Sequence, residues 1–162
     1  MKTSFKRLTA LLLALVLTLS LLSAAAIAAD VPGYAHLRIG TASGQPGDTV
    51  KVPIYLEGLK DGDQCRGFGA TVELGENLTL EGMEWAVPTA FFSTVNSETG
   101  LFSSFDMMGG QGGAPYNYIT ENGKVCDLKV KIADDATTVG TVSLTGINVN
   151  GKSSTDFLNS TD

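Results

Sequence analysis

Hydrophobic and polar residues alternate with a period of two along most of the chain after its first 29 residues. The segment 49–58, TVKVPIYLEG, shows this most clearly, because one of its faces carries Val50, Val52, Ile54 and Leu56. A period of two is typical of a β-strand with one buried face. Further strands are predicted, in chain order, at 35–40, 67–74, 77–86, within a hairpin over 91–108 that turns at NSETG, at 118–133 and at 141–149.

Segments rich in Gly and Asp separate these strands, among them TASGQPGD, GLKDGDQ, NSETG and DDATTVG. No stretch of this part of the chain has a sustained helical period, and no internal repeat or long linker interrupts it. Many short strands at regular spacing, joined by such turns, indicate two packed sheets. We therefore predict an all-β fold, a β-sandwich, formed by one domain over residues 30–162.

Pro53 interrupts the alternation of segment 49–58. Proline has no backbone N–H to donate, so within sheets it is confined to edge strands and to bulges. We predict that this strand lies at a sheet edge or is irregular, and that it is not a central strand.

The first 29 residues have the layout of a secretory signal peptide. A basic start precedes the apolar run LTALLLALVLTLSLLSAAAIAA, which ends in small residues. A membrane anchor is the alternative, since about 20 apolar residues can span a bilayer, but the alanine-rich end favours cleavage near Ala28 or Ala29. We expect residues 1–29 to be removed and the remainder to be secreted, extracellular and free of the membrane.

The charge balance of the remainder is acidic. Without the three basic residues of the leader, eight basic residues stand against 17 acidic ones, a formal net charge of about −9. Such a surface repels phosphate groups, so we expect no nucleic acid among the partners.

Residue types that carry chemistry are scattered. His36 is the only histidine, and no serine lies in a G-x-S-x-G elbow. The pairs Asp61/Asp63 and Asp134/Asp135 lie in loops where Asp is favoured for turn hydrogen bonds; a calcium site at DGD is the less favoured alternative. A glycosidase pair has no positive support. We predict no catalytic residue, no metal site and no enzyme activity.

Three further features have two interpretations each. Export would permit a disulfide between Cys65 and Cys126, but the strand phase points Cys126 inward, and we favour free thiols. GGQGG (109–113) lacks the context of a phosphate cradle and is better explained as a flexible surface loop. Aromatic side chains can stack on sugar rings; a core or edge-packing role for Trp85 is favoured, and polysaccharide binding is kept as an alternative. The candidates for stacking are Trp85, Tyr55, Tyr116 and Tyr118.

The order of these segments resembles that of a cohesin domain. LRIGTASGQPGDTVKVPIYLEGL is similar to the family's first strand, Gly-Asp turn and Val-x-Val-Pro strand, and GFGATVELGENLTLEGMEW resembles its third and fourth strands. NSETGLFSSFDMMGG resembles the central hairpin. The most specific similarity lies in YNYITENGKVCDLKVKIADDATTVGTVSLTGI, with its I-T-x-[DN]-G turn. The similarity extends from about residue 36 to residue 150.

The resemblance implies a nine-stranded jelly-roll sandwich that binds dockerin modules. Cohesins are non-catalytic receptors for dockerin-bearing polysaccharide-degrading enzymes in cellulosome-type assemblies, and the calcium belongs to the dockerin, so no cofactor is expected here. The chain departs from the family at its end: the last strand, which pairs beside the first, is expected to be missing.

The resemblance also implies a binding face. The family binds dockerin on the flat sheet made by its third, fifth, sixth and eighth strands. Family members carry polar residues where this chain has two glycines, at 67 and 69. The positions expected to face the partner are Gly67, Gly69, Thr71, Glu73, Thr94, Asn96, Leu101, Ser103 and Phe105.

Overall fold

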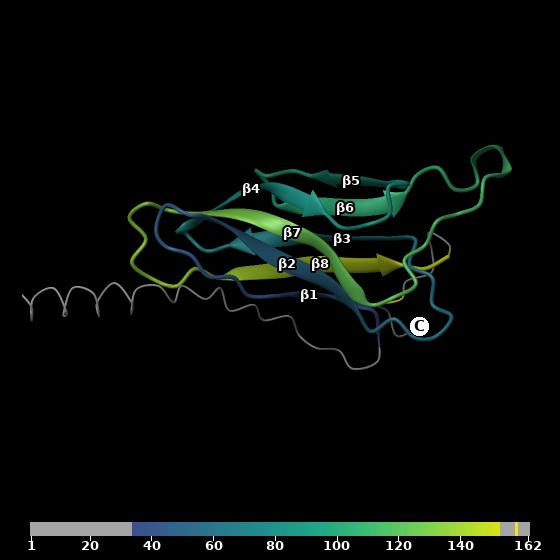
Figure 1. Ribbon diagram of the computed structural model, residues 1–162, viewed down its shortest axis with the longest axis horizontal. Coiled ribbons are helices and arrows are strands. Elements are labelled where there is room, and N and C mark those ends of the chain that lie inside the picture. The colour runs from purple at the N-terminus through teal and green to yellow at the C-terminus, as the bar shows by residue number, and fades with distance from the viewer. Residues whose placement is uncertain (1–33, 153–157, 159–162) are drawn as a thin grey trace, which may run out of the picture.

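The computed structural model describes residues 34–152 and residue 158, and this part of the chain forms eight β-strands in two layers (Figure 1). The predicted signal peptide lies outside the described residues. The predicted all-β sandwich is confirmed. The strands are β1 (His36–Ile39), β2 (Thr49–Glu57), β3 (Gly67–Leu74), β4 (Leu78–Trp85), β5 (Phe91–Val95), β6 (Leu101–Asp106), β7 (Gly123–Ile132) and β8 (Val142–Asn150), with a 3-10 turn, η1 (Gln111–Gly113), between β6 and β7.

Each layer is a four-stranded antiparallel sheet. One sheet has the order β1-β2-β7-β4 and the other the order β5-β6-β3-β8. Period-two alternation places apolar residues of both sheets between the layers, where burial of their surface stabilises the fold. The largest side chains that are fully buried there include Leu37, Ile54, Leu56 and Leu128 from the first sheet and Phe68, Phe102, Val142 and Val149 from the second.

The position of β2 corrects the prediction made from Pro53. This strand is central, because it pairs with β1 on one side and β7 on the other. The register shifts between Ile54 and Tyr55, directly after the proline, so the expected irregularity is present. The carbonyl of Pro53 accepts a hydrogen bond from the Gly40 N–H at 2.7 Å, just beyond the end of β1. A central strand tolerates the proline because the missing donor falls where its neighbouring strand ends.

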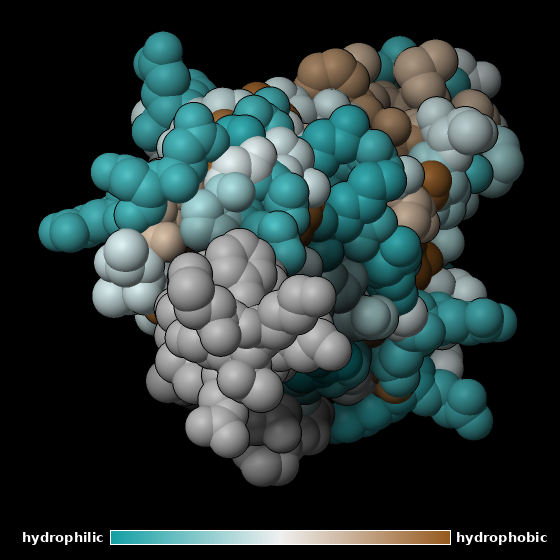
Figure 2. Space-filling model, turned by 60° about the vertical axis from the view of Figure 1, so that its left-hand side comes forward, coloured by the Kyte–Doolittle hydropathy of each residue, from teal (hydrophilic) through white to brown (hydrophobic). Residues whose placement is uncertain are grey.

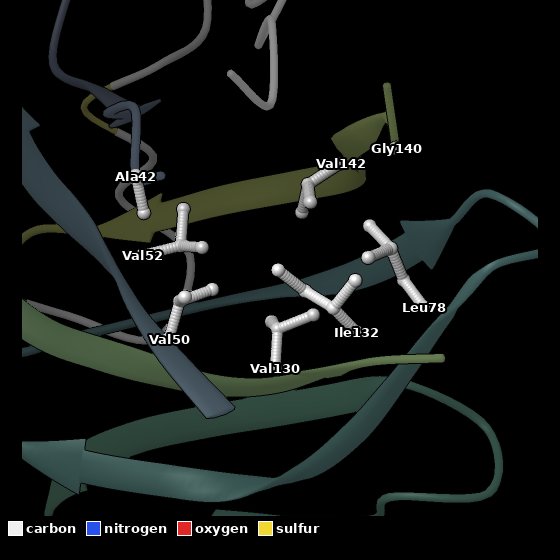
Figure 3. Close-up of a pocket in the computed structure, with 8 residues that line it drawn as sticks. All are labelled: Ala42, Val50, Val52, Leu78, Val130, Ile132, Gly140 and Val142. Atoms are coloured by element: carbon white, nitrogen blue, oxygen red, sulfur yellow. The ribbon is translucent and has the colours of Figure 1, made fainter. Parts of the chain in front are cut away.

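A small cavity lies between the two sheets near one end of the sandwich. Its volume is about 20 Å³, and Figure 3 shows aliphatic side chains from both layers pointing into it. Apolar cavities of this size stay dry and are defects of packing rather than ligand sites. The residues that line it are Ala42, Val50, Val52, Leu78, Val130, Ile132, Gly140 and Val142.

The two sheets are linked at the edge formed by β1 and β8. The Leu158 N–H donates to the Val149 carbonyl at 2.8 Å, and the Leu158 carbonyl accepts from the Ala35 N–H at 3.1 Å. The last strand of the cohesin pattern is not among the strands of the described residues, as expected. Leu158 nevertheless makes a backbone hydrogen bond to β8 and another to Ala35, directly before β1, so it bridges this edge of the two layers.

Charged pairs cover the outer face of the β1-β2-β7-β4 sheet. The Glu84 carboxylate accepts hydrogen bonds from Lys129, at 2.8 Å, and Lys51, at 2.6 Å, and these bonds lower the pKa of Glu84 to about 2. Arg38 and Glu57 form a second pair at 2.8 Å. Exposed pairs of this kind contribute little stability, and they make this face strongly hydrophilic. No helix in residues 34–152 is long and apolar enough to cross a membrane.

Candidate partner face

The outer face of the β5-β6-β3-β8 sheet carries the positions that sequence reasoning selected. On β3, Phe68, Ala70 and Val72 are buried in the core, so the alternate positions from Gly67 to Glu73 face outward. On β6, Phe102, Ser104 and Asp106 are buried, which leaves Leu101, Ser103 and Phe105 on the outer face. The structure therefore brings these positions to the outer side of one sheet, although Gly67 and Gly69 are themselves buried there and only Thr71 and Glu73 of the β3 set are accessible. Their role in binding a partner stays a prediction.

Cross-strand pairing arranges these positions in rows. In one row Phe92 on β5 lies opposite Phe105, which lies opposite Gly67 on β3. The next row runs from Thr94 through Ser103 and Gly69 to Asn148 on β8. A third joins Leu101, Thr71 and Thr145. The large apolar side chains of the face thus lie on β5 and β6, where Thr94 and Ser103 interrupt them, and the outward residues named on β8 are polar.

Gly67 and Gly69 have no room for a side chain. A Cβ at Gly67 would lie 2.7 Å from the Phe105 Cβ and 2.9 Å from the Ser104 carbonyl oxygen. A Cβ at Gly69 would lie 2.9 Å from the Phe102 carbonyl oxygen. These approaches are closer than van der Waals contact. The close approach of β6 therefore leaves no space at positions 67 and 69 for the polar side chains of the cohesin pattern.

Sequence reasoning missed Phe92, which is exposed by 49% and whose ring centroid lies 5.7 Å from that of Phe105. The alternation that placed Thr94 outward also places Phe92 outward, so the signal was present. It missed the β8 positions as well, Thr145 and Asn148 among them. Their phase is hidden in the sequence because the β3–β8 register shifts between Gly69 and Thr71.

Asn96 begins the turn of the β5–β6 hairpin, and its side chain bonds the backbone of that turn. Its Oδ1 accepts hydrogen bonds from the backbone N–H groups of Glu98, at 2.9 Å, and Thr99, at 3.1 Å. Gly100 ends the turn at φ 72°, a left-handed conformation in which its carbonyl accepts from the Val72 N–H. Asn96 therefore holds the turn, and its amide oxygen is already engaged.

Asp106 ends β6 as a buried carboxylate, exposed by only 1%. Burial is the largest single influence on its pKa and raises it. Hydrogen bonds from the N–H groups of Asn117 (2.8 Å), Met108 (3.2 Å) and Gly109 (3.2 Å) together outweigh that influence, so the pKa of Asp106 lies below its ordinary value. The ionised side chain thereby ties residues 108, 109 and 117 of the β6–β7 connection to the end of β6.

Large hydrophobic side chains are exposed on this side of the molecule. In Figure 2 the hydrophobic atoms gather mainly at the top, the level at which β5 and β6 lie in Figure 1, and most of the remaining visible surface is hydrophilic. Among the described residues, the large hydrophobic side chains that are exposed are Phe92, Leu101, Phe105, Met107, Met108, Tyr116 and Val139.

Two of the groups weighed for catalysis or metal binding, Asp63 and His36, lie within hydrogen-bond distance of nearby backbone atoms. No three His, Cys, Asp or Glu side chains within residues 34–152 are grouped as metal ligands would be. Asp63 accepts a hydrogen bond from the Lys60 N–H at 2.8 Å, the turn bond that its loop predicts. His36 is partly buried on β1, with Nδ1 2.9 Å from the Tyr34 carbonyl oxygen. The sequence favours a lone surface histidine here, whereas the structure leaves the side chain only 17% exposed.

The two cysteines are free and buried. Cys65 is more enclosed than its place at the mouth of β3 suggested, and its thiol donates to the Gly67 carbonyl at 3.4 Å. Burial raises the pKa of Cys65 to about 11 and that of Cys126 still further. The preference for free thiols over a disulfide is confirmed.

The aromatic residues weighed for sugar stacking do not form one row. Trp85 packs against the core, with its ring centroid 6.2 Å from that of Phe102, as the favoured interpretation predicts. Tyr116 and Tyr118 lie 6.2 Å apart in the segment between β6 and β7. Tyr55 lies on the other sheet, beneath the Arg38 guanidinium.

No protein-family model and no curated protein matches this chain. Among solved structures it is similar to the cohesin module of a family 33 glycoside hydrolase from Clostridium perfringens, with a TM-score of 0.59 and 13% identity over 74% of this chain and 85% of that one. It is also similar to the third ScaC cohesin of Acetivibrio cellulolyticus, solved with the ScaB dockerin. There the TM-score is 0.58 and the identity 16%, over 75% and 90% of the two chains.

A third similar structure is the sixth cohesin of scaffoldin B from the same organism, solved in complex with a dockerin mutant. Its TM-score is 0.58 and its identity 21%, over 73% of this chain and 86% of that one. At such identities the similarity lies in the fold. The described residues therefore have the β-sandwich fold of cohesin modules, as the order of sequence segments predicts.

Proposed function

We propose that this chain is a secreted, non-catalytic recognition module that binds dockerin modules of extracellular polysaccharide-degrading enzymes in a cellulosome-type assembly. The observation that carries the proposal is the outer face of the β5-β6-β3-β8 sheet, where exposed Phe92, Leu101 and Phe105 lie beside small polar residues. Similar folds have been solved with dockerins bound, which supports the same class of partner.

The two outer faces of the sandwich differ in a way that favours this sheet as the binding surface. The opposite sheet is covered by ion pairs such as Lys51–Glu84 and Arg38–Glu57. On the candidate face, Glu73 is the only charged residue among the predicted partner positions. Interface cores are depleted of charge and enriched in aromatic side chains, so a partner loses less hydration energy by covering this sheet.

The shape of the face suits a helical partner. Positions 67 and 69 carry no side chain, and Gly69 lies between Ser103 on β6 and Asn148 on β8, whereas Gly67 lies opposite Phe105. An apolar stripe of a helix could pack along Leu101 and Phe105 while its polar flank meets the Asn and Thr side chains of β8. Any calcium required would belong to the dockerin.

Capture from the medium of the source organism tests the proposal. The chain, purified as its host processes it, is immobilised and exposed to the secreted proteins with and without a calcium chelator. Calcium-dependent recovery of dockerin-bearing enzymes is the expected result. The variant L101Q should lose most of the capture, and V139Q, which changes an equally exposed residue outside the face, should retain it.

Other results contradict the proposal. A folded chain that recovers no dockerin-bearing protein is not a dockerin receptor, and retention on insoluble polysaccharide would then favour the carbohydrate-binding alternative. Equal loss of capture in L101Q and V139Q would show that the sheet face is not the contact surface.

A further inference from the structure

The loop that follows β6 continues the apolar character of the candidate face. Of the seven large hydrophobic side chains exposed among the described residues, all but Val139 lie on β5, on β6 or in segment 107–117. Met107 and Met108 are exposed by 47% and 58%. Met107 also continues the outward phase of Leu101, Ser103 and Phe105. A cluster of exposed apolar side chains on this scale marks an interaction surface.

Charge is absent from the exposed part of the same region. Between Thr99 and Tyr118 the only ionisable acidic or basic side chain is Asp106, which is buried. This gap is notable in a chain whose formal net charge is −6 over its full length. The loop itself therefore offers a partner no exposed fixed charge, and the nearest one is the Arg66 guanidinium against Tyr116. A partner surface that covers the methionines should be uncharged, since it would otherwise bury unpaired charges.

The loop is held in place although five of its eleven residues, 107–117, are not larger than alanine. Asp106 accepts hydrogen bonds from the N–H groups of Met108, Gly109 and Asn117, which joins the start of the loop to its end. Within the loop, the Gly110 N–H donates to the Ala114 carbonyl at 2.9 Å. These bonds restrict the loop before any partner arrives, and such preorganisation lowers the entropic cost of binding.

Tyr116 connects the loop to the start of β3. The guanidinium of Arg66, directly before β3, lies 4.3 Å from the centroid of the Tyr116 ring. The ring also covers Gly109 and Gly110, where a Cβ would collide with it. In Figure 1 the loop extends beyond the ends of the strands, at the upper right. Its methionines, Met107 and Met108, directly follow the last residue of β6, so they lie on the anchored base of the loop.

We propose that segment Met107–Tyr116 is a second contact segment of the partner face, which binds the apolar end of the same helical protein that lies across β6 and β3. This inference rests on the proposed function and adds a recognition element outside the sheet. Unbranched methionine side chains adapt to differently shaped apolar surfaces. The loop would accordingly contribute affinity for this protein, and the sheet would fix its orientation.

The test uses the dockerin module recovered with the unaltered chain as its probe, in titration calorimetry. The variant M107Q/M108Q should bind about tenfold more weakly, with an unchanged thermal midpoint. V139Q, the matched control on the β7–β8 loop, should bind as the unaltered chain does. Mild peroxide oxidation provides a second measurement: the bound dockerin should slow oxidation of Met107 and Met108, while Met83, which packs on the core, serves as the internal reference.

The outcomes separate the two proposals. If L101Q loses binding while M107Q/M108Q keeps full affinity and both methionines oxidise at the same rate in the complex, the sheet is the site and the loop is not. If the unaltered chain recovers no dockerin at all, both proposals fail together. Protection from oxidation that occurs without dockerin and increases with concentration of this chain would instead assign the loop to contacts between copies, and would overturn the inference.

Discussion

The rings of Phe92 and Phe105 lie side by side on the outer face of one sheet, with centroids 5.7 Å apart and planes tilted by 59°. Their residues are direct cross-strand partners on β5 and β6. Such a pair contributes roughly 0.2–1 kcal/mol to pairing of the strands. Both rings nevertheless remain exposed, by 49% and 38%. We therefore expect the two rings to contribute more free energy to binding, when a partner covers them, than they contribute to folding.

Replacing Phe92 by Ser separates these two contributions. We expect F92S to weaken dockerin binding by about tenfold or more, because aromatic side chains near an interface core are common hot spots. The free energy of unfolding should fall by no more than about 1 kcal/mol, since only the pairing with Phe105 is lost. Calorimetric titration and urea unfolding measure the two effects. A variant that unfolds easily but binds with full affinity would show that Phe92 serves the fold.

Restoring a polar side chain at Gly67, as the cohesin pattern has it, should harm this chain. A serine there must displace the Phe105 Cβ and the Ser104 carbonyl, and overpacking of this kind costs about 1–3 kcal/mol. Urea unfolding of G67S should show this loss. G123S is the matched control, because a Cβ at Gly123 meets nothing within 4 Å. Equal stability of the two variants would mean that β3 and β6 can move apart without cost.

Sequence alone was sufficient for the strands and for most of the outward positions. Strands and their outward positions follow from alternation with a period of two, and this alternation can be recognised within a short segment of the sequence. The irregularity predicted from Pro53 is present, but the prediction that β2 is not a central strand was wrong, because edge or central placement depends on where β1 ends and no local pattern records that. The sequence predicted that GGQGG lies in a surface loop. It did not predict that Asp106 holds this loop by hydrogen bonds to Gly109 and Asn117. Asp106 and Asn117 are 11 residues apart, and only the fold shows that they meet.

Protonation of Asp106 should weaken the fold at acid pH. Its pKa is lower in the folded chain than in the unfolded one, so its contribution to stability is complete above the ordinary carboxyl pKa, near 4. The contribution is lost as the pH falls through the lower, folded value. We expect D106N to be less stable than the unaltered chain by about 1–3 kcal/mol at pH 7, because a buried amide N–H replaces an acceptor.

The comparison of D106N with the unaltered chain isolates this group from the other carboxylates. The difference in free energy of unfolding between the two proteins should narrow when urea titrations are repeated from pH 5 down to pH 2. A difference that stays constant over this range would show that the Asp106 carboxylate is not ionised in the folded chain. Loss of dockerin affinity in D106N at pH 7, without loss of the sheet contacts, would further support the loop as a contact segment.

The two thiols should be unreactive until the chain unfolds. Burial raises the pKa of Cys65 to about 11 and that of Cys126 further, so thiolate, the reactive form, is scarce at pH 8. An aromatic disulfide reagent should therefore label neither cysteine in the native chain and both in 8 M urea, without prior reduction. Mass spectrometry after alkylation counts the labelled thiols. Labelling that requires a reductant would reveal a disulfide between Cys65 and Cys126, and rapid labelling of native Cys65 would show that the start of β3 opens to solvent.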